Sequence, residues 1–244
     1  MNENQGHLHP LTTAIRDIHA IFQRMGFEIA NGPELETEFY NFDALNIPKD
    51  HPARDMQDTF WIKTDKKDQK DQKDEHDRSI RPVLRTHTSP VQIRYMESHM
   101  PPYRVIVPGK VFRNEATDAT HEAQFYQIEG LVIDKKISMA HLKGTLEKFY
   151  TEFFGDNVQV RFRPSFFPFV EPALEVDIFY RGKWLEVKGA GLVHPNVLKA
   201  AGIDPATWQG FAFGGGIERL AMIKYGIDDV RQFYSGDLRF VNQF

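Results

Sequence analysis

The chain has 244 residues, of which 41% are hydrophobic and 26% are charged, and its formal net charge is -4. This balance is typical of a folded protein and excludes an intrinsically disordered one. Because the chain contains no cysteine, a disulfide framework, a thiolate zinc site and a cysteine nucleophile are also excluded. Its first residues are polar and it has no long apolar run, so we expect neither a secretory signal nor a membrane span and predict a cytoplasmic location.

The amino-terminal residues predict a helix followed by a short strand. Apolar residues recur at helical spacing over 11–25, and Gly26 is typical of the residue that ends a helix. Residues 27–30 then indicate a strand, and a turn that ends at Pro33 closes this first unit.

A low-complexity insert separates two further predicted strands, at 59–63 and 83–85. Residues 64–79 contain five basic and six acidic side chains and no apolar residue. Because nothing in this segment can anchor it to a core, a solvated loop is favoured over an RNA-binding arm.

The rest of the chain consists of four predicted helices and seven predicted strands, most of which follow one another without a helix between them. Helices are expected from the 86–90 segment to about 100, and over 138–154, 195–201 and 216–225. Strands are expected over 103–107, 110–114, 125–134, 159–163, 175–179, 184–188 and 210–213. Strands joined by turns predict an antiparallel sheet with helices at its ends and on one face, which is an α+β fold. Without a βαβ alternation, a Rossmann-type nucleotide site is disfavoured.

Residues 112–125 are the first candidate for chemistry. They have the form of two antiparallel strands joined by a long loop. Arg113 offers a planar, permanently charged group that matches a phosphate, and Phe125 offers a flat face on which a purine can stack. From these residues alone, a surface arginine and a core phenylalanine are an equally good interpretation.

Residues 214–223 are the second candidate. Three glycines end a predicted strand, and Arg219 lies in the first turn of the helix that follows. Glycines on a strand let a ligand approach the backbone closely. Taken alone, a glycine bulge beside a solvent-facing arginine remains the simpler interpretation.

Together with the helix–strand–Pro33 unit, these segments resemble, in order, the three motifs of class II aminoacyl-tRNA synthetases. Other segments resemble the alpha-subunit family of bacterial-type phenylalanyl-tRNA synthetases, namely 6–10, 40–46, 55–60, 85–90 and 189–196. The resemblance covers the chain outside 64–79. It implies the class II catalytic fold, a six- or seven-stranded antiparallel sheet flanked by helices, in one domain over 1–244.

The resemblance also implies an activity and partners. Members of this family activate L-phenylalanine with ATP and Mg²⁺ to form phenylalanyl-adenylate. They transfer the phenylalanyl group to the 3′-terminal ribose of tRNA(Phe), as the catalytic subunit of an (αβ)2 heterotetramer with a beta subunit. The 13% of aromatic residues and the negative net charge agree with this, because a beta subunit would cover apolar surface and supply most of the RNA-binding field.

For the nucleotide, the resemblance assigns catalytic roles to Arg113, at the α-phosphate, and to Arg219, at the far end of the triphosphate. No protein nucleophile is needed, because the amino acid's carboxylate attacks and pyrophosphate leaves. The implied ATP site is completed by Glu115, His121, Phe125, Glu186 and Gly216. Glu171 is the implied Mg²⁺ ligand, which suits a hard cation; a purely structural carboxylate is the alternative.

For the amino-acid site, the alternation of side chains between the two faces of a strand adds independent support. Gln127 and Glu129 are two residues apart and share a face of their strand, and the resemblance places them at the substrate's ammonium group. It places Phe167 and Phe169 against the substrate's ring. Ordinary core packing is the alternative for this second pair, although the proline between them favours an irregular, pocket-lining segment. The implied pocket is completed by His87, Ser89, Gln92, Val170, Ala212 and Gly214, with Ala212 limiting the size of a para substituent.

The chain also departs from the family. Gly215 stands where a bulky apolar residue is common, and Lys188 stands where an apolar one is expected. The family's alpha subunit normally begins with a long coiled coil that contacts tRNA, and we expect this sequence to lack it, through truncation or natural shortness. The missing anticodon-binding domain of the mitochondrial form favours the two-subunit enzyme.

Two other functions remain open from the sequence. A synthetase-like enzyme could form the same adenylate and pass the acyl group to an acceptor other than tRNA. A catalytically silent binding paralogue is the second alternative, but the motif residues Arg113, Glu115, Phe125, Glu129 and Arg219 disfavour it.

Overall fold

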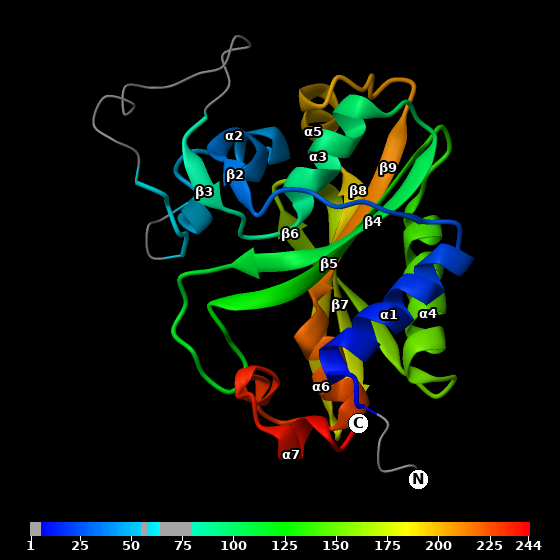
Figure 1. The fold of residues 1–244 in the computed structure, drawn as a ribbon. Coiled ribbons are helices and arrows are strands. Elements are labelled where there is room, and N and C mark those ends of the chain that lie inside the picture. The colour runs from blue at the N-terminus through cyan, green and yellow to red at the C-terminus, as the bar shows by residue number, and fades with distance from the viewer. Residues whose placement is uncertain (1–5, 55–57, 64–79) are drawn as a thin grey trace.

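The computed structural model describes residues 6–54, 58–63 and 80–244, so the predicted loop at 64–79 lies outside the described residues. Within them, seven strands form one sheet in the order β1-β4-β5-β9-β8-β7-β6 (Figure 1). Their bounds are Glu28–Ile29 (β1), Tyr103–Phe112 (β4), Gln124–Asp134 (β5), Val160–Phe167 (β6), Val170–Tyr180 (β7), Lys183–Val193 (β8) and Gln209–Gly216 (β9). All neighbouring strands are antiparallel except β1 and β4, which are parallel. The predicted α+β fold is confirmed.

Helices and a small second sheet complete the described part of the chain. The helices are α1 (Pro10–Arg24), α2 (Glu38–Asn41), α3 (Ser89–Ser98), α4 (Met139–Phe154), α5 (Pro195–Ala200), α6 (Ile217–Tyr225) and α7 (Leu238–Val241), with 3₁₀ turns η1 (Asp43–Leu45), η2 (Pro52–Arg54) and η3 (Val230–Tyr234). Strands β2 (Leu35–Thr37) and β3 (Pro82–Leu84) form the second sheet. None of these helices is long and apolar enough to cross a bilayer.

Helix α1 begins and ends as its sequence predicts. Nδ1 of His9 accepts a hydrogen bond from the Leu11 amide at 3.2 Å, which caps the first turn, and Pro10 occupies the first helical position. After the helix, Gly26 has a φ of +79°, a left-handed conformation that favours glycine. The strand that follows is shorter than predicted and pairs with β4.

The sheet strands are longer than their apolar patterns predict. The two strands predicted at 103–107 and 110–114 are one continuous strand, β4, and β7, β8 and β9 all extend beyond the predicted ranges. Hydrogen bonds from both neighbours keep the polar and glycine positions extended. The strand predicted at 59–63 is wrong, because only Trp61 bridges to Val83 there.

Helices α1, α4 and α6 cover one face of the sheet, whereas α3 and α5 pack against part of the other face, so the prediction of helices on one face holds only in part. Residues of α1, α4 and α6 share one apolar core with the sheet, and α1 and α4 lie side by side against it in Figure 1. At the centre of this core, the Phe22 ring stacks on Phe149 at 4.7 Å and on Phe213 at 5.4 Å between centroids. A second core lies where η1, α3 and α5 meet β4 and β5. The rest of the opposite face is left for a cavity.

A buried arginine connects the first unit to strand β4. Nε of Arg85 donates to the Lys110 carbonyl at 2.7 Å, and its Nη1 donates to the carbonyls of Gly32 and Pro33 at 3.1 and 3.2 Å. Gly109 is required beside it, because a Cβ there would lie 2.2 Å from the Arg85 guanidinium. This anchor positions the residues that follow Arg85, which enter the cavity.

Candidate active site

One cavity of about 770 Å³ lies on the face of the sheet that α1 and α4 do not cover. It is bordered by the exposed faces of β5, β8 and β9, the start of α3, the turn between β6 and β7, and the loop after β4. Arg113, Arg219, Phe167 and Phe169 all line it. Every predicted site residue borders this cavity with the exception of Glu171.

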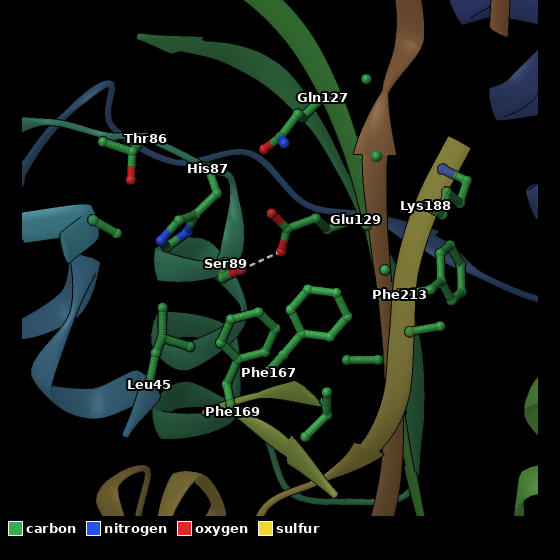
Figure 2. Close-up of a pocket in the computed structure, with 18 of the residues that line it drawn as sticks. Leu45, Thr86, His87, Ser89, Gln127, Glu129, Phe167, Phe169, Lys188 and Phe213 are labelled. Atoms are coloured by element: carbon green, nitrogen blue, oxygen red, sulfur yellow. Dashed lines mark hydrogen bonds between the residues drawn. The ribbon is translucent and has the colours of Figure 1, made fainter. Parts of the chain in front are cut away.

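At one end of the cavity, a polar wall is built around the buried carboxylate of Glu129, which is 6% exposed. The Thr88 amide donates to its Oε1 at 3.0 Å, and Gln92 Nε2 and the Ser89 hydroxyl donate to its Oε2. Figure 2 shows the bond from Ser89. Burial raises the pKa of Glu129, whereas the bonds from Ser89 and Thr88 lower it. A carboxylate held in this way suits a cationic ligand group, because the ligand's charge replaces the water that burial removed.

Two neighbouring polar groups are left without partners. Both ring nitrogens of His87 and Oε1 of Gln127 are buried and have no hydrogen-bond partner among the residues that the structure describes. Burial, and then the charge of Arg113, lower the pKa of His87 to about 3, so its ring is neutral at physiological pH. Unpartnered buried groups on a cavity wall are typical of a site that a polar ligand completes.

The apolar wall of the same end is a slot formed by the turn between β6 and β7. The rings of Phe167 and Phe169 are 5.8 Å apart and nearly parallel, at 17°, and both point into the cavity in Figure 2. The pairing of β6 with β7 shifts register between Ser165 and Phe167, as expected for an irregular segment at Pro168. Gly189 is also needed, because a Cβ there would lie 2.9 Å from the Phe167 ring.

The opposite end of the cavity carries the two arginines. Arg113 follows β4, its Nε donates to the Thr86 carbonyl at 3.1 Å, and its guanidinium lies 5.1 Å from the centre of the Phe125 ring. Arg219 is in the first turn of α6 and is half-buried. Because β9 lies beside β5 in the sheet, α6 brings Arg219 to the cavity that Arg113 borders. This end therefore combines two permanent cations with a flat ring.

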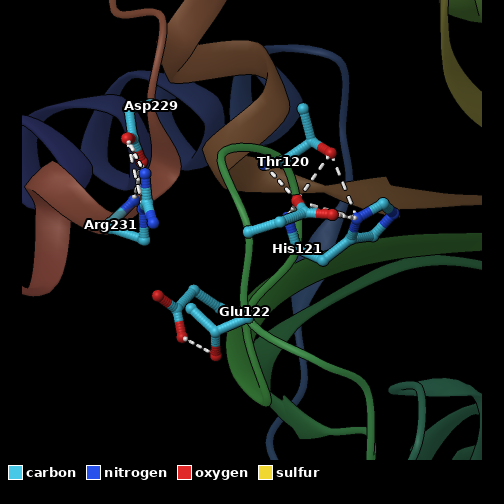
Figure 3. A network of polar contacts seen from close by, with 7 residues as sticks. Thr120, His121, Glu122, Asp229 and Arg231 are labelled. Carbon is cyan, nitrogen blue, oxygen red and sulfur yellow. Dashed lines mark hydrogen bonds and ion pairs between the residues drawn. The ribbon is translucent and has the colours of Figure 1, made fainter.

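The loop between β4 and β5 is held by a local polar network (Figure 3). Oδ1 of Asp118 accepts from the amides of Thr120 and His121 at 2.6 and 2.9 Å, and its Oδ2 lies 2.9 Å from Nδ1 of His121. The interaction with His121, followed by these hydrogen bonds, lowers the pKa of Asp118. The loop also receives a hydrogen bond from the Val230 amide to the Ala119 carbonyl at 2.9 Å. It is therefore attached to η3 at its tip.

Glu218 is a site residue that the sequence did not assign. Its Oε1 accepts from the Tyr126 amide at 2.8 Å and from the Tyr234 hydroxyl at 2.5 Å, so it joins β5, α6 and η3 beside the arginines. Burial raises its pKa to about 7. The feature of the sequence that could have identified Glu218 is an acidic residue immediately before Arg219 on a helix that is otherwise largely apolar.

The two departures from the family lie together on β8 and β9, where both residues border the cavity while the lysine side chain points to the other face of the sheet. A Cβ at Gly215 would lie 2.2 Å from the Val187 carbonyl oxygen and 2.7 Å from Cγ of Lys188, so the missing side chain leaves room for the backbone of β8 as well as for the lysine. Nζ of Lys188 is 5.7 Å from the ring centres of both Phe149 and Phe213, and it has no hydrogen-bond partner among the described residues. Figure 2 shows Lys188 and Phe213 on the side of β8 and β9 away from Glu129.

Glu171 lies apart from the other predicted residues. Its side chain is 77% exposed, 3.7 Å from Nε2 of His194, and it borders a neighbouring hollow instead of the main cavity. No group of three or more potential metal-ligating side chains occurs in the part of the chain that the structure describes. Its role as a Mg²⁺ ligand stays a prediction.

Comparison with known proteins agrees with this architecture. The family model described as the tRNA synthetase class II core domain (F) matches residues 1–244. The chain belongs to this family. Class II synthetases that it resembles include the phenylalanine–tRNA ligase alpha subunit of Synechocystis sp., with 51% identity over 240 residues, 98% of this chain and 68% of the relative. The same subunit of Bacillus subtilis is 52% identical over 253 residues, 98% of this chain and 69% of the relative.

The class II motifs are neighbours in space. Motif 1 is α1 with β1, motif 2 is β4 with the loop and β5, and motif 3 is β9 with α6. The strand order places motif 3 directly beside motif 2 and motif 1 at the edge of the sheet. The synthetase cavity therefore lies over motifs 2 and 3, and the turn between β6 and β7 adds its aromatic slot.

Proposed function

We propose that this chain is the catalytic alpha subunit of a phenylalanine–tRNA ligase, which activates L-phenylalanine with ATP and transfers it to tRNA(Phe). One observation carries this proposal: two arginines distant in sequence border a single cavity whose other end is an aromatic slot beside a buried carboxylate. The phenylalanine–tRNA ligase alpha subunits of Synechocystis sp. and Bacillus subtilis support the same amino acid.

The cavity suits phenylalanine at each of its groups. The substrate's ammonium would lie against Glu129, with His87 and Gln127 as further polar contacts. Its benzyl ring would enter the slot between Phe167 and Phe169, where offset or edge-to-face packing of rings is favoured. The carboxylate of Glu129 would hold the substrate's ammonium group, and the apolar slot would hold its ring. These two contacts fix the orientation of the substrate, so its own carboxylate is directed toward Arg113 and Arg219.

Activation then requires positioning more than covalent catalysis. A carboxylate oxygen of phenylalanine forms a bond to the α-phosphorus of ATP, and the bond from that phosphorus to the bridging oxygen breaks to release pyrophosphate. Arg113 would neutralise charge at the α-phosphate and Arg219 at the leaving pyrophosphate, while Phe125 stacks on adenine. No side chain has to accept a proton, because the substrate's carboxylate is already ionised.

The residues that border the cavity match the groups of ATP more closely than they match a metal ion. Mg²⁺ usually keeps several waters and binds phosphates together with one or two carboxylates, so a single protein ligand is sufficient. Glu171 is the predicted ligand; its carboxylate is 77% exposed and borders the neighbouring hollow, so it would hold an ion only at that edge of the site. When bound, Mg²⁺ would supply further charge neutralisation at the phosphates.

The second step and the assembly belong to the same proposal. The phenylalanyl group would pass from the adenylate to the 3′-terminal ribose of tRNA(Phe), in the cytoplasm and within an (αβ)2 heterotetramer. The net charge of -4 supports a partner subunit, because an acidic chain attracts a polyanion poorly on its own.

Amino-acid-dependent exchange of pyrophosphate into ATP tests the proposal directly. We expect the subunit, assembled with its cognate beta subunit, to catalyse exchange with phenylalanine and with no other standard amino acid at a comparable rate. Absence of exchange with every amino acid would identify a silent paralogue. Exchange with phenylalanine, but no charging of tRNA by a complete assembly, would indicate an acceptor other than tRNA.

The aromatic slot provides a prediction about specificity. Ala212 lines the cavity on β9, opposite Leu131 of β5 and Gly191 of β8. Ala212→Gly removes a methyl group from the slot, so we expect para-substituted phenylalanines such as 4-chlorophenylalanine to gain at least about tenfold in kcat/KM relative to phenylalanine. Exchange assays with both amino acids measure this ratio. An unchanged ratio would show that Ala212 does not border the para position.

A further inference from the structure

The motif 2 loop, between β4 and β5, has no apolar core that holds it in place. It carries Glu115 and His121 of the implied ATP site, yet none of residues 112–126 is buried. Burial of apolar side chains, which stabilises most of the fold, therefore contributes little here, and segments with few buried contacts open most readily. The position of this loop beside the nucleotide site depends on polar contacts.

Hydrogen bonds attach the loop at its base and at its tip. At the base, the Arg113 amide donates to the Ala123 carbonyl at 2.9 Å. At the tip, Asp118 accepts from amides of the loop itself, which shapes the turn but does not locate it in the cavity. The Val230 amide, from outside the loop, donates to the Ala119 carbonyl at 2.9 Å. This bond fixes the tip of the loop relative to η3.

The turn η3, which supplies this bond, is itself anchored in the fold. Phe233 is 4% exposed, and its ring packs edge-on against Phe240 at 5.8 Å between centroids. The Tyr234 hydroxyl donates to Glu218, which precedes Arg219 on α6. The turn is thus held both in the core and beside the arginine of motif 3.

His9 holds η3 from a third side, at the start of the helix of motif 1. Its Nδ1 accepts from the Leu11 amide and caps α1, so its ring proton is on Nε2. Nε2 therefore donates to the Phe233 carbonyl, at 2.9 Å. Because one imidazole caps α1 and holds η3, this turn connects all three class II motifs although none of them includes it.

We propose that η3 supports the motif 2 loop in the position that binds ATP, with the backbone amide of Val230 as the positioning group and His9 as a positioning residue behind it. The inference rests on the proposed function, which places ATP beside this loop. A loop already in place avoids the entropy cost of ordering it on binding, and a misplacement of about 1 Å can cost about 10²-fold in rate. The slot for the substrate's ring lies on the turn between β6 and β7, so this support concerns ATP and not the amino acid.

The substitution Val230→Pro tests the support by removing one amide proton. Val230 is the first residue of η3, and Asp229 before it has an extended backbone, with φ -135° and ψ 115°. Both positions suit proline, whose ring is also apolar. In the complete α–β assembly, we expect the KM for ATP to rise about 10-fold and kcat to fall about as much, while the KM for phenylalanine stays within about twofold.

Leu238→Pro is the matched control. Leu238 is the first residue of α7, and Asp237 before it also has an extended backbone and caps its turn as Asp229 does. The Leu238 amide donates no hydrogen bond to any residue that the structure describes, and the residue is 72% exposed. This variant should leave both KM values and kcat unchanged.

His9→Asn is a second variant, which provides the result if Val230→Pro does not fold. An asparagine oxygen can replace Nδ1 as the cap of α1, but asparagine has no group at the position of Nε2, so the bond to Phe233 is lost. We expect the KM for ATP to rise about threefold with the KM for phenylalanine unchanged. The thermal midpoint should fall by no more than about 4 °C, the effect of one hydrogen bond.

Hydrogen–deuterium exchange followed by mass spectrometry observes the loop directly. Peptides that cover residues 115–122 should exchange at least about tenfold faster in Val230→Pro than in the wild type or in Leu238→Pro. The proposal is overturned if the loop exchanges at the wild-type rate, or if Val230→Pro raises the KM for ATP and the KM for phenylalanine alike, which would indicate a general loss of structure.

The two measurements separate this inference from the proposed function. A wild-type assembly without phenylalanine-dependent pyrophosphate exchange would refute the proposed activity, whereas the hydrogen exchange of the loop would still test its support by η3. Normal pyrophosphate exchange in the wild type, together with an unaltered loop and an unaltered KM for ATP in both variants, would refute the support alone.

Discussion

Arg113→Ala is expected to lower kcat/KM for phenylalanine-dependent pyrophosphate exchange by about 10³-fold, the effect of removing one preorganised charged donor from a developing transition state. Arg113 is placed for this by its bond to the Thr86 carbonyl and by the nearby Phe125 ring. Most of the loss should appear in kcat, because the charge on the α-phosphate is redistributed as pyrophosphate leaves.

The substitution Arg113→Lys distinguishes the contribution of the positive charge from that of the planar guanidinium group. A lysine keeps the positive charge but lacks the planar group that contacts two phosphate oxygens, so it should restore only part of the lost rate. Arg24→Ala is the control, because Arg24 is 61% exposed in a surface ion pair with Glu152 and should leave exchange unchanged. If Arg113→Ala retained a rate within about fivefold of the wild type, a value far below the loss of one such donor, Arg113 would not contact the reacting phosphate.

Lys188→Met is expected to stabilise the protein, with the largest effect below neutral pH. Burial among Phe149, Phe213 and their neighbours lowers the pKa of Lys188 from 10.5 to about 7, and the charge of Glu129 opposes this shift. Below pH 7 the folded protein therefore holds a buried ammonium, at a cost on the order of 5 kcal/mol by the free energy of a pKa shift of this size. Methionine has a similar length and no charge.

The sign of the pH dependence follows from the two pKa values. Between about pH 7 and 10.5 the unfolded chain binds a proton at Lys188 that the folded chain does not, so the wild type gains stability as pH rises through this window. Lys188→Met should lack this component and be more stable than the wild type at pH 6 to 7, by up to about 10 °C in thermal midpoint for a chain of this size.

Thermal unfolding at pH 6, 7.5 and 9 measures this difference. Lys143→Met is the matched control, because Nζ of Lys143 also lies over a ring, 5.4 Å from the centre of Phe162, but the residue is only half-buried. Its substitution should shift the midpoint little and equally at all three pH values. A Lys188→Met protein that is less stable than the wild type at pH 6 would mean that contacts of the ammonium with the rings outweigh its desolvation.

Local sequence patterns predicted correctly those structural features that depend only on residues close together in the chain. Helix α1 and its glycine stop, the shared face of Gln127 and Glu129 and the irregular turn at Pro168 all follow from spacing and from residue chemistry. The strand predicted at 59–63 shows the limit of such reasoning. Its residues favour an extended backbone, but they pair with β3 only through the Trp61–Val83 bridge and the hydrogen bonds of Phe60 and Ile62 on either side of it, and a longer strand needs a neighbour along its whole length to satisfy its hydrogen bonds.

By itself, the sequence determined the order of the elements, the motifs and the kinds of side chain available for chemistry. The tertiary structure decided which of them meet: inserting β9 between β5 and β8 brings Arg219 to the cavity of Arg113, and the same folding leaves Glu171 outside that cavity, at a neighbouring hollow. It also decided the burial of Lys188. The physical reason is that strand order, burial and charge environment depend on contacts between residues far apart in the chain, whereas helices, turns and strand faces depend on residues a few positions apart.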